Sequence, residues 1–272
     1  MLVGLLAASQ TRLARVAVTE AVAQEAVASA RWTARAGLEV AMHRLNRSDA
    51  NSVSCQIGDA RMQISIEDEE AKIDLNMVSP PTIRALLTRL GLPEAASTPL
   101  ADAIADYRDA DDLVRLNGAE GTAYDALGLP GPKNAPLESF AELTRVLGAE
   151  NLSLAQLSRH ATVHSGRRSV DPALASPIVL GVLQDLSSPK GARAPSRRAV
   201  FRILVTVETM SGARAGLGAV VRIGRSRTTV LDLWDARIAA ASPAAVGDLP
   251  DCLLIHWVSS DEQDRPRRSR LR

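Results

Sequence analysis

The densest group of side chains able to do chemistry lies near the middle of this 272-residue chain. Asp109, Asp111 and Asp112 supply three carboxylates within four residues, and Asn117 and Glu120 follow shortly after. Hard oxygen ligands of this kind, placed on an irregular loop, are what Ca²⁺ coordination requires. Their spacing does not match the loop of an EF-hand, which also needs a closing Glu at a fixed position. One interpretation is therefore a calcium site of another type.

A second interpretation needs no metal. The same acids can belong to the end of a helix, where they pair with Arg108 and Arg115 and cap the next turn. The acidic run Glu67–Glu70 is similarly open, since it could lie on the same face of the molecule or form a solvated strand end. Residue types alone do not choose between these interpretations.

No catalytic site is expected. The chain lacks a nucleophile elbow, a phosphate-binding loop, a His-Glu-x-x-His motif and a dinucleotide fingerprint. Asp106 and Asp109 could be imagined as a catalytic pair, but nothing nearby in the sequence would separate their pKa values. A calcium-dependent hydrolase is therefore the weakest of the functions considered.

The two cysteines, Cys55 and Cys252, and the four histidines have no zinc-site spacing. A disulfide between the cysteines is compatible with an oxidising compartment, and two unpaired thiols are equally compatible with the sequence.

The charge of the chain argues against nucleic acid as a partner. Lys and Arg number 32 against 31 Asp and Glu, but five arginines fall within residues 265–272, so residues 1–264 carry a net charge of −4. The stretch from Phe140 to Leu157 has the layout of a helix-hairpin-helix, and a nucleic-acid-binding protein is the alternative function. Residues 94–150 hold eleven acids and four bases, and such a surface repels a polyanion.

A long N-terminal helix is the clearest structural expectation. Residues 5–45 contain no proline and one glycine, and small or apolar residues recur along them at steps of three and four. About forty residues at 1.5 Å each predict a rod of about 60 Å. A rod of this length should project or pack against other chains. The chain has no run of 18 apolar residues, so a complete transmembrane helix is not expected.

Beyond this helix the pattern predicts an α+β fold. Residues 52–57 and 61–66 alternate as a hairpin around Gly58-Asp59, and strand patterns return at 200–207, 219–223 and 228–234. Between them lie short helical patterns bounded by Gly and Pro, at residues 82–90, 99–109, 137–147, 153–160 and 177–186. This order predicts a helical domain inserted into a small sheet that is completed only after the insertion.

The predicted domains follow from that order. Residues 1–49 form the N-terminal helix, 50–78 and 190–235 the α/β domain, 79–189 the inserted all-helical domain, and 236–272 a poorly structured extension.

Several of these segments resemble general secretion pathway protein K, the large minor pseudopilin of bacterial type II secretion systems. The similarity covers roughly residues 9–234. The matching segments, in order, are Ala36–Glu39, Ile66–Asn76, Asp106–Asp112, Asn117–Glu120, Pro132–Pro136 with Glu138, and the final strands.

The resemblance implies a pseudopilin fold, in which a long N-terminal helix packs on a small antiparallel sheet, here with a helical insertion. It implies a structural role in protein secretion at the tip of the periplasmic pseudopilus, beside the minor pseudopilins I and J. It also implies bound Ca²⁺, for which the residues from Asp109 to Glu120 are the expected ligands.

The resemblance further implies an inner-membrane anchor. Family members begin with a basic leader and about twenty apolar residues, of which only the end matches here, at Leu2–Ala8. We therefore expect the membrane part of the N-terminal helix to be largely missing from this sequence. Asp171-Pro172 and the segment after Trp234 also depart from the family pattern.

Overall fold

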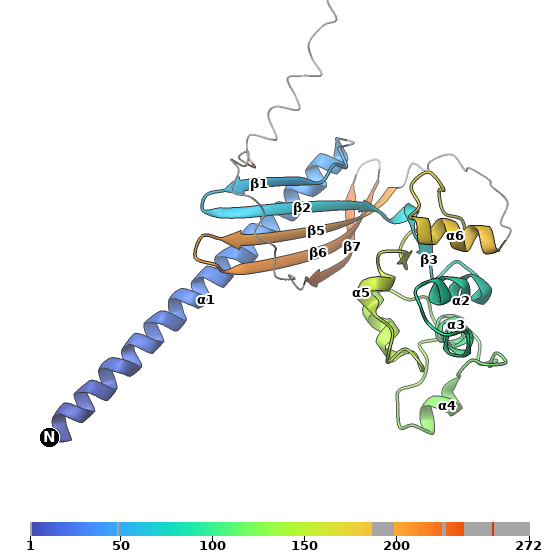
Figure 1. Cartoon of the computed structure of the whole chain (residues 1–272), viewed down its shortest axis with the longest axis horizontal. Coiled ribbons are helices and arrows are strands. Elements are labelled where there is room, and N and C mark those ends of the chain that lie inside the picture. Colours follow the sequence, from blue (N-terminus) through green and yellow to red (C-terminus); the bar gives the residue numbers. More distant parts are fainter. Residues whose placement is uncertain (1, 48, 187–198, 225–226, 237–251, 253–272) are drawn as a thin grey trace, which may run out of the picture. The chain divides into compact units, whose positions relative to one another are not determined.

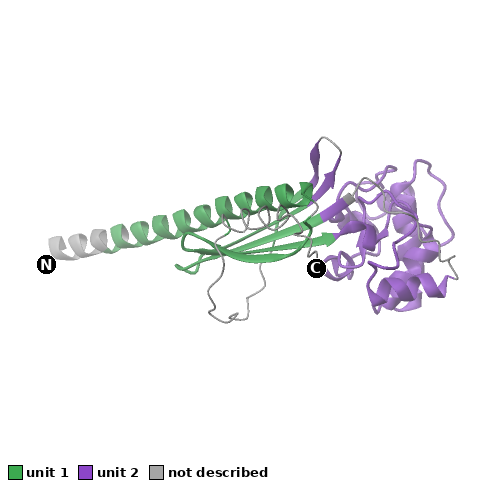
Figure 2. Cartoon of the chain, turned by 90° about the horizontal axis from the view of Figure 1, so that it is seen from above, with its two compact units in different colours: residues 1–67, 202–219, 233–272 green, residues 68–201, 220–232 purple. Residues whose placement is uncertain are grey.

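The computed structural model describes residues 2–47, 49–186, 199–224, 227–236 and 252 (Figure 1). The chain divides into two compact units (Figure 2). Unit 1 comprises residues 1–67, 202–219 and 233–272, and unit 2 comprises residues 68–201 and 220–232. The four domains expected from the sequence differ in their boundaries from these two units, and the four-domain division stays a prediction. Most of the predicted C-terminal extension lies outside the described residues.

Helix α1 (Leu2–Asn46) confirms the long N-terminal helix. Its buried side chains form a stripe of small and apolar residues: Ala30, Ala34, Leu38, Ala41 and Leu45, each at most 5% exposed. The predicted stripe began earlier, but its member Val16 is 63% exposed, and the neighbouring Val18 and Val22 are also at least 60% exposed. Among the described residues, no helix is both long enough and apolar enough to cross a membrane.

Close packing between α1 and the sheet depends on one glycine. A Cβ atom added to Gly37 would lie 2.3 Å from Met62 Sδ and 2.7 Å from Val205 Cγ1. Met62 lies on strand β2 (Ala60–Asp68) and Val205 on strand β5 (Ala199–Thr209). The helix backbone therefore approaches two adjacent strands more closely than a side chain would permit.

The sheet has five strands in the order β1-β2-β5-β6-β7 (Figure 1). Strand β1 (Val53–Ile57) pairs antiparallel with β2 around Gly58-Asp59, in the predicted hairpin. Strands β6 (Arg214–Ile223) and β7 (Thr228–Asp235) complete the sheet beyond β5. Strand β5 lies next to β2 although more than a hundred residues separate them, so the sheet is completed after the insertion, as expected.

The segment between β2 and β5 consists mainly of short helices. Its elements are η1 (Glu69–Ala71), β3 (Ile73–Asp74), α2 (Pro80–Arg89), α3 (Glu94–Arg108), α4 (Gly121–Asp125), η2 (Phe140–Arg145), α5 (Leu154–Leu157), β4 (Ala161–Thr162) and α6 (Pro177–Asp185). Strands β3 and β4 pair in parallel, so the insertion is not purely helical.

Two helices predicted in this segment are shorter than expected. The helix expected over 137–147 is reduced to the six-residue 3₁₀ helix η2, because Val146 adopts an extended conformation. The helix expected over 153–160 is reduced to α5, because residues 160–162 join β3: Ile73 N donates to His160 O at 3.0 Å, and Leu75 N donates to Thr162 O at 2.8 Å. Tertiary pairing overrides helix propensity there.

Unit 2 has its own apolar core, which includes Leu86, Leu87, Ile104, Tyr124 and Leu143, all fully buried. A polar side chain joins distant segments beside this core. Asn76 Nδ2 donates to Leu137 O at 2.8 Å and to Val163 O at 2.9 Å, and Asn76 Oδ1 accepts from Leu137 N at 2.9 Å.

Candidate functional site

The predicted metal ligands lie around the loop that joins α3 to α4 in unit 2. Asp109 follows the last residue of α3, and its N–H donates to Ala105 O at 3.1 Å. Glu120 directly precedes α4. The charges of Asp106 and Asp109 act on the carboxyl group of Glu120. Burial, and secondly these neighbouring acids, raise the pKa of Glu120 above its ordinary value.

Buried carboxylate oxygens without a partner mark the centre of this site. Glu120 is 7% exposed, and neither Oε1 nor Oε2 has a hydrogen-bond partner. Asp109 Oδ1 is also buried and unpartnered. Buried acceptors are nearly always satisfied in proteins, so such oxygens need an explanation, and a cation is one.

The other three predicted ligands make different bonds. Asp111 Oδ1 accepts from Leu113 N at 3.0 Å, and Asp112 Oδ1 accepts from Asn134 Nδ2 at 2.8 Å. The Asn117 side chain donates to Asp102 Oδ2 at 3.2 Å.

Arginine pairing, the second interpretation of the acids, also holds in part. Arg115 Nη1 forms ion pairs with Asp106 and Asp109, and Asp106 is fully buried. Arg108 instead donates to the backbone oxygen of Val78. Burial lowers the pKa of Arg108 from its ordinary value. One arginine therefore neutralises part of the cluster and leaves Glu120 without a basic partner among the described side chains.

Asn134 is a candidate ligand that residue types alone did not single out. It has a φ of 48°, in the left-handed region that asparagine tolerates better than most residues. Its N–H donates to Tyr107 O at 3.0 Å, and its Oδ1 is buried without a partner. Its position within the segment Pro132–Pro136 was the available signal, but only the fold places it beside Asp112.

The unpartnered buried oxygens are of the chemical type that binds a hard cation. Glu120, Asp109 and Asn134 offer carboxylate and amide oxygens, whereas Ca²⁺ takes six to eight oxygens, so backbone or water oxygens would have to complete the shell. Within the part of the chain that the structure describes, no three His, Cys, Asp or Glu side chains have the arrangement of a metal site.

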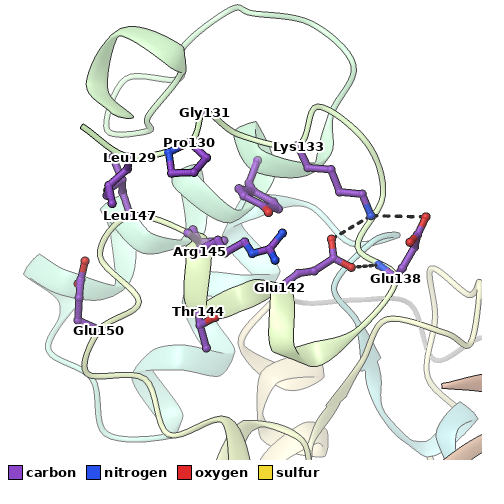
Figure 3. Close-up of a pocket in the computed structure, with 12 residues that line it drawn as sticks. Leu129, Pro130, Gly131, Lys133, Glu138, Glu142, Thr144, Arg145, Leu147 and Glu150 are labelled. Atoms are coloured by element: carbon purple, nitrogen blue, oxygen red, sulfur yellow. Dashed lines mark hydrogen bonds and ion pairs between the residues drawn. The ribbon is translucent and has the colours of Figure 1, made fainter. Parts of the chain in front are cut away.

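A pocket of about 600 Å³ lies in the same unit, beside η2 (Figure 3). Tyr107, Leu129 and Val146 provide part of its apolar wall. Lys133 Nζ lies 2.9 Å from Glu142 Oε2 and 3.5 Å from Glu138 Oε1, as the dashed lines in Figure 3 show. Its lining residues include no His or Cys.

The acidic run Glu67–Glu70 is solvated at its start and buried at its end, because Glu67 on β2 is exposed and the last two acids are not. Glu69 is fully buried, and its Oε1 accepts from Lys72 Nζ at 2.7 Å. Glu70 is also buried and lies 2.9 Å from Arg167. The solvated interpretation was wrong for Glu69 and Glu70, because η1 turns both side chains inward, where basic partners compensate their burial.

The structure joins Cys55 and Cys252 in a disulfide, which the sequence left open. The S–S distance is 2.08 Å and the Cα atoms lie 5.0 Å apart. The bond ties residue 252 to strand β1 within unit 1.

Comparisons with known proteins give one sequence family and one shared fold. Residues 61–166 match the model of type II secretion system protein K. A search of curated proteins found no match. Among solved structures, the chain is similar to a chain of the GspK-GspI-GspJ complex from the enterotoxigenic Escherichia coli type 2 secretion system. The identity is 14% and the TM-score 0.64, over 82% of this chain and 100% of that chain.

The family match covers β2, α2, α3 and the loop between α3 and α4, and the shared fold covers 82% of the chain. Residues 61–166 therefore resemble protein K of type II secretion systems, and the chain has the fold of the similar solved chain.

Proposed function

We propose that this chain is the tip subunit of a periplasmic pseudopilus. The observation that carries this proposal is that side-chain burial differs between the two parts of α1. The buried stripe from Ala30 onward packs on the chain's own sheet, whereas Val16, Val18 and Val22 lie exposed on the preceding turns. An apolar helix segment without a partner in its own chain is suited to packing against like helices.

The predicted mechanism needs no catalytic turnover. The exposed part of α1 would pack into a bundle of pseudopilin helices. The large folded part of the chain that follows α1 would leave no room for another subunit above it. A filament built by head-to-tail contacts stops growing where the next subunit has no room to bind. The family consists of structural secretion subunits and not of known enzymes.

The proposed partners are the minor pseudopilins I and J. The similar solved chain was crystallised in a complex of GspK with GspI and GspJ, which supports this choice. Nothing in the comparisons supports the alternative of a nucleic-acid-binding protein.

Co-purification with the two partner pseudopilins tests the proposal. Val18→Glu should abolish co-purification, whereas Met210→Ser, a change of another exposed apolar residue in unit 1, should not. Retention of both partners by Val18→Glu would contradict a role for this exposed part of α1.

The proposed location is the periplasm, with anchoring to the inner membrane through the N-terminal helix. The Cys55–Cys252 disulfide supports it, because structural disulfides persist in oxidising compartments such as the periplasm. Thiol alkylation of the chain from cells, before and after reduction, tests this location. Labelling of both cysteines without reduction would contradict it.

Ca²⁺ binding near Glu120 and Asp109 is part of the proposal. The ion would neutralise the unpartnered buried oxygens of these residues, and Asn134 would contribute an amide oxygen. When bound, the ion would cross-link the two ends of the loop and would have no catalytic role.

Calorimetry of the EDTA-treated chain with added Ca²⁺ tests this site. Glu120→Gln should abolish the binding heat. Asp111→Ala is the matched control, because Asp111 bonds to its own loop, and it should weaken binding less. Equal binding by Glu120→Gln and the unaltered chain would exclude Glu120 as a ligand.

A further inference from the structure

The loop between α3 and α4 exposes large apolar side chains in close succession. Leu113 is 76% exposed, Val114 is 61% exposed and Leu116 is 97% exposed. We call residues 113–116 the apolar loop. Beyond the other end of α4, Leu127 is 64% and Leu129 is 45% exposed (Figure 1). Exposed apolar residues are ordinary when isolated, but a group of them marks an interaction site.

The backbone of the apolar loop is braced. Leu113 N donates to Asp111 Oδ1 at 3.0 Å, Arg115 N donates to Asp106 Oδ2 at 3.2 Å, and Gly118 N donates to Arg115 O at 3.0 Å. The Arg115 side chain is held inward by its ion pairs with Asp106 and Asp109. The loop cannot bury its leucines against its own core without breaking these bonds.

The loop also passes unusually close to α3. A Cβ atom added to Gly118 would lie 1.9 Å from Asp106 Oδ2, so this position admits only glycine. A braced loop loses little conformational entropy when it docks, which favours binding.

The surroundings of the apolar loop are negatively charged. Residues 101–125 contain seven acids and two arginines, a net charge of −5. Asp111, Asp112 and Asp125 are exposed, whereas Arg115 is already paired within the loop. A bound Ca²⁺ would leave the segment negative. Anionic lipid and a second copy of this loop carry the same sign of charge, so both would be repelled.

We propose that the apolar loop docks onto an apolar surface flanked by Lys and Arg on a partner protein. Leu113, Val114 and Leu116 would contact the apolar surface, and the surrounding acids would meet its basic rim. This role goes beyond the proposed assembly through α1, because the loop belongs to unit 2 and uses none of the exposed valines of α1.

Two designed helical peptides test the proposal on the full chain. Both carry the same stripe of leucines, flanked by lysines in one peptide and by glutamates in the other. Fluorescence anisotropy should show binding of the lysine peptide only, and binding should weaken with added salt. The double change Leu113→Ser and Leu116→Ser should weaken it at least about tenfold. Leu174→Ser, which changes a 50% exposed leucine of the same unit, should not.

Four results would overturn the proposal: binding of both peptides alike, binding of neither, an unchanged affinity in the double variant, or an equal loss in Leu174→Ser. Loop-dependent binding to zwitterionic vesicles, or loop-dependent self-association, would assign the loop to lipid or to a second copy instead. An unchanged melting temperature confirms that the double variant is folded. Co-purification of the double variant with the partner pseudopilins separates failure here from failure of the α1 proposal.

Discussion

At the scale of single residues, Glu120 is the most informative, because its burial conflicts with its negative charge. It is a buried acid whose two oxygens have no partner, and it lies in a field of other acids. Such a group costs stability when it is ionised, unless a cation binds it. Its burial and charge therefore link metal binding to the pH dependence of folding.

The sign of that pH dependence follows from the raised pKa of Glu120. Below the unfolded-state value near 4.5, both states hold the proton and the charge costs nothing. As pH rises through the folded-state pKa, the folded state must ionise a buried carboxyl and loses stability. Without metal, Glu120→Gln should therefore be more stable than the unaltered chain at neutral pH, by about 1 kcal/mol, and this gain should vanish in acid.

Thermal unfolding at several pH values measures this difference. In EDTA the variant should melt higher near pH 7, whereas in excess Ca²⁺ the order should reverse, because only the unaltered chain gains binding free energy. A variant that melts lower in EDTA at every pH would show that Glu120 stabilises the fold by some other contact.

At the scale of elements, the fold depends on two close approaches that join segments distant in the chain. Gly37 lets α1 approach β2 and β5, and Asn76 ties the start of the inserted segment to residues 137 and 163. Both are single residues whose replacement should affect a whole element.

Gly37→Val should destabilise the protein by about 2 kcal/mol through overpacking against Met62 and Val205. Ala28→Val is the control, because Ala28 is exposed on the same helix, and it should cost far less. Denaturant unfolding measures both. Adding Met62→Ala to the valine variant should recover part of the loss, and no recovery would locate the strain elsewhere.

Asn76→Ala should cost about 3 kcal/mol, since three hydrogen bonds of roughly 1 kcal/mol each disappear and leave backbone groups unpaired. Asn151→Ala changes an exposed asparagine of the same unit and should be nearly neutral. Hydrogen exchange should show faster exchange of the Leu137 amide in the first variant. If that amide stays protected, the bond to Asn76 is not what protects it.

At the scale of the whole molecule, the disulfide closes the longest covalent loop in the described structure. Cys55 and Cys252 are 197 residues apart in the sequence. Cross-linking residues so far apart removes much conformational freedom from the unfolded chain, with a chain-entropy estimate of about 5 kcal/mol as an upper bound.

Reduction of Cys55–Cys252 should therefore lower the melting temperature, by an amount that corresponds to about 2–5 kcal/mol. The double change Cys55→Ala and Cys252→Ala should melt as the reduced chain does and should not respond to reductant. A melting temperature unchanged by reduction would mean that the cross-link does not restrict the unfolded chain.

Much of the fold was predictable because its signals are local. The absence of proline over residues 5–45 and the repeated small residues indicate α1, and alternation around Gly58-Asp59 indicates the β1–β2 hairpin. The short strands β3 and β4 were not predictable, because parallel pairing across more than eighty residues leaves no local pattern. Helix α4, with five residues, is likewise too short to show a period.

The candidate site was likewise only partly predictable from the sequence. Sequence alone limits how far apart the acids from Asp109 to Glu120 can lie, because they are close along the chain. Only the tertiary structure decided which oxygens are buried and unpartnered, that Arg115 neutralises Asp106 and Asp109, and that Asn134 joins the group. Burial and ion pairing depend on neighbours brought together by the folded chain, and no order of residue types encodes them locally.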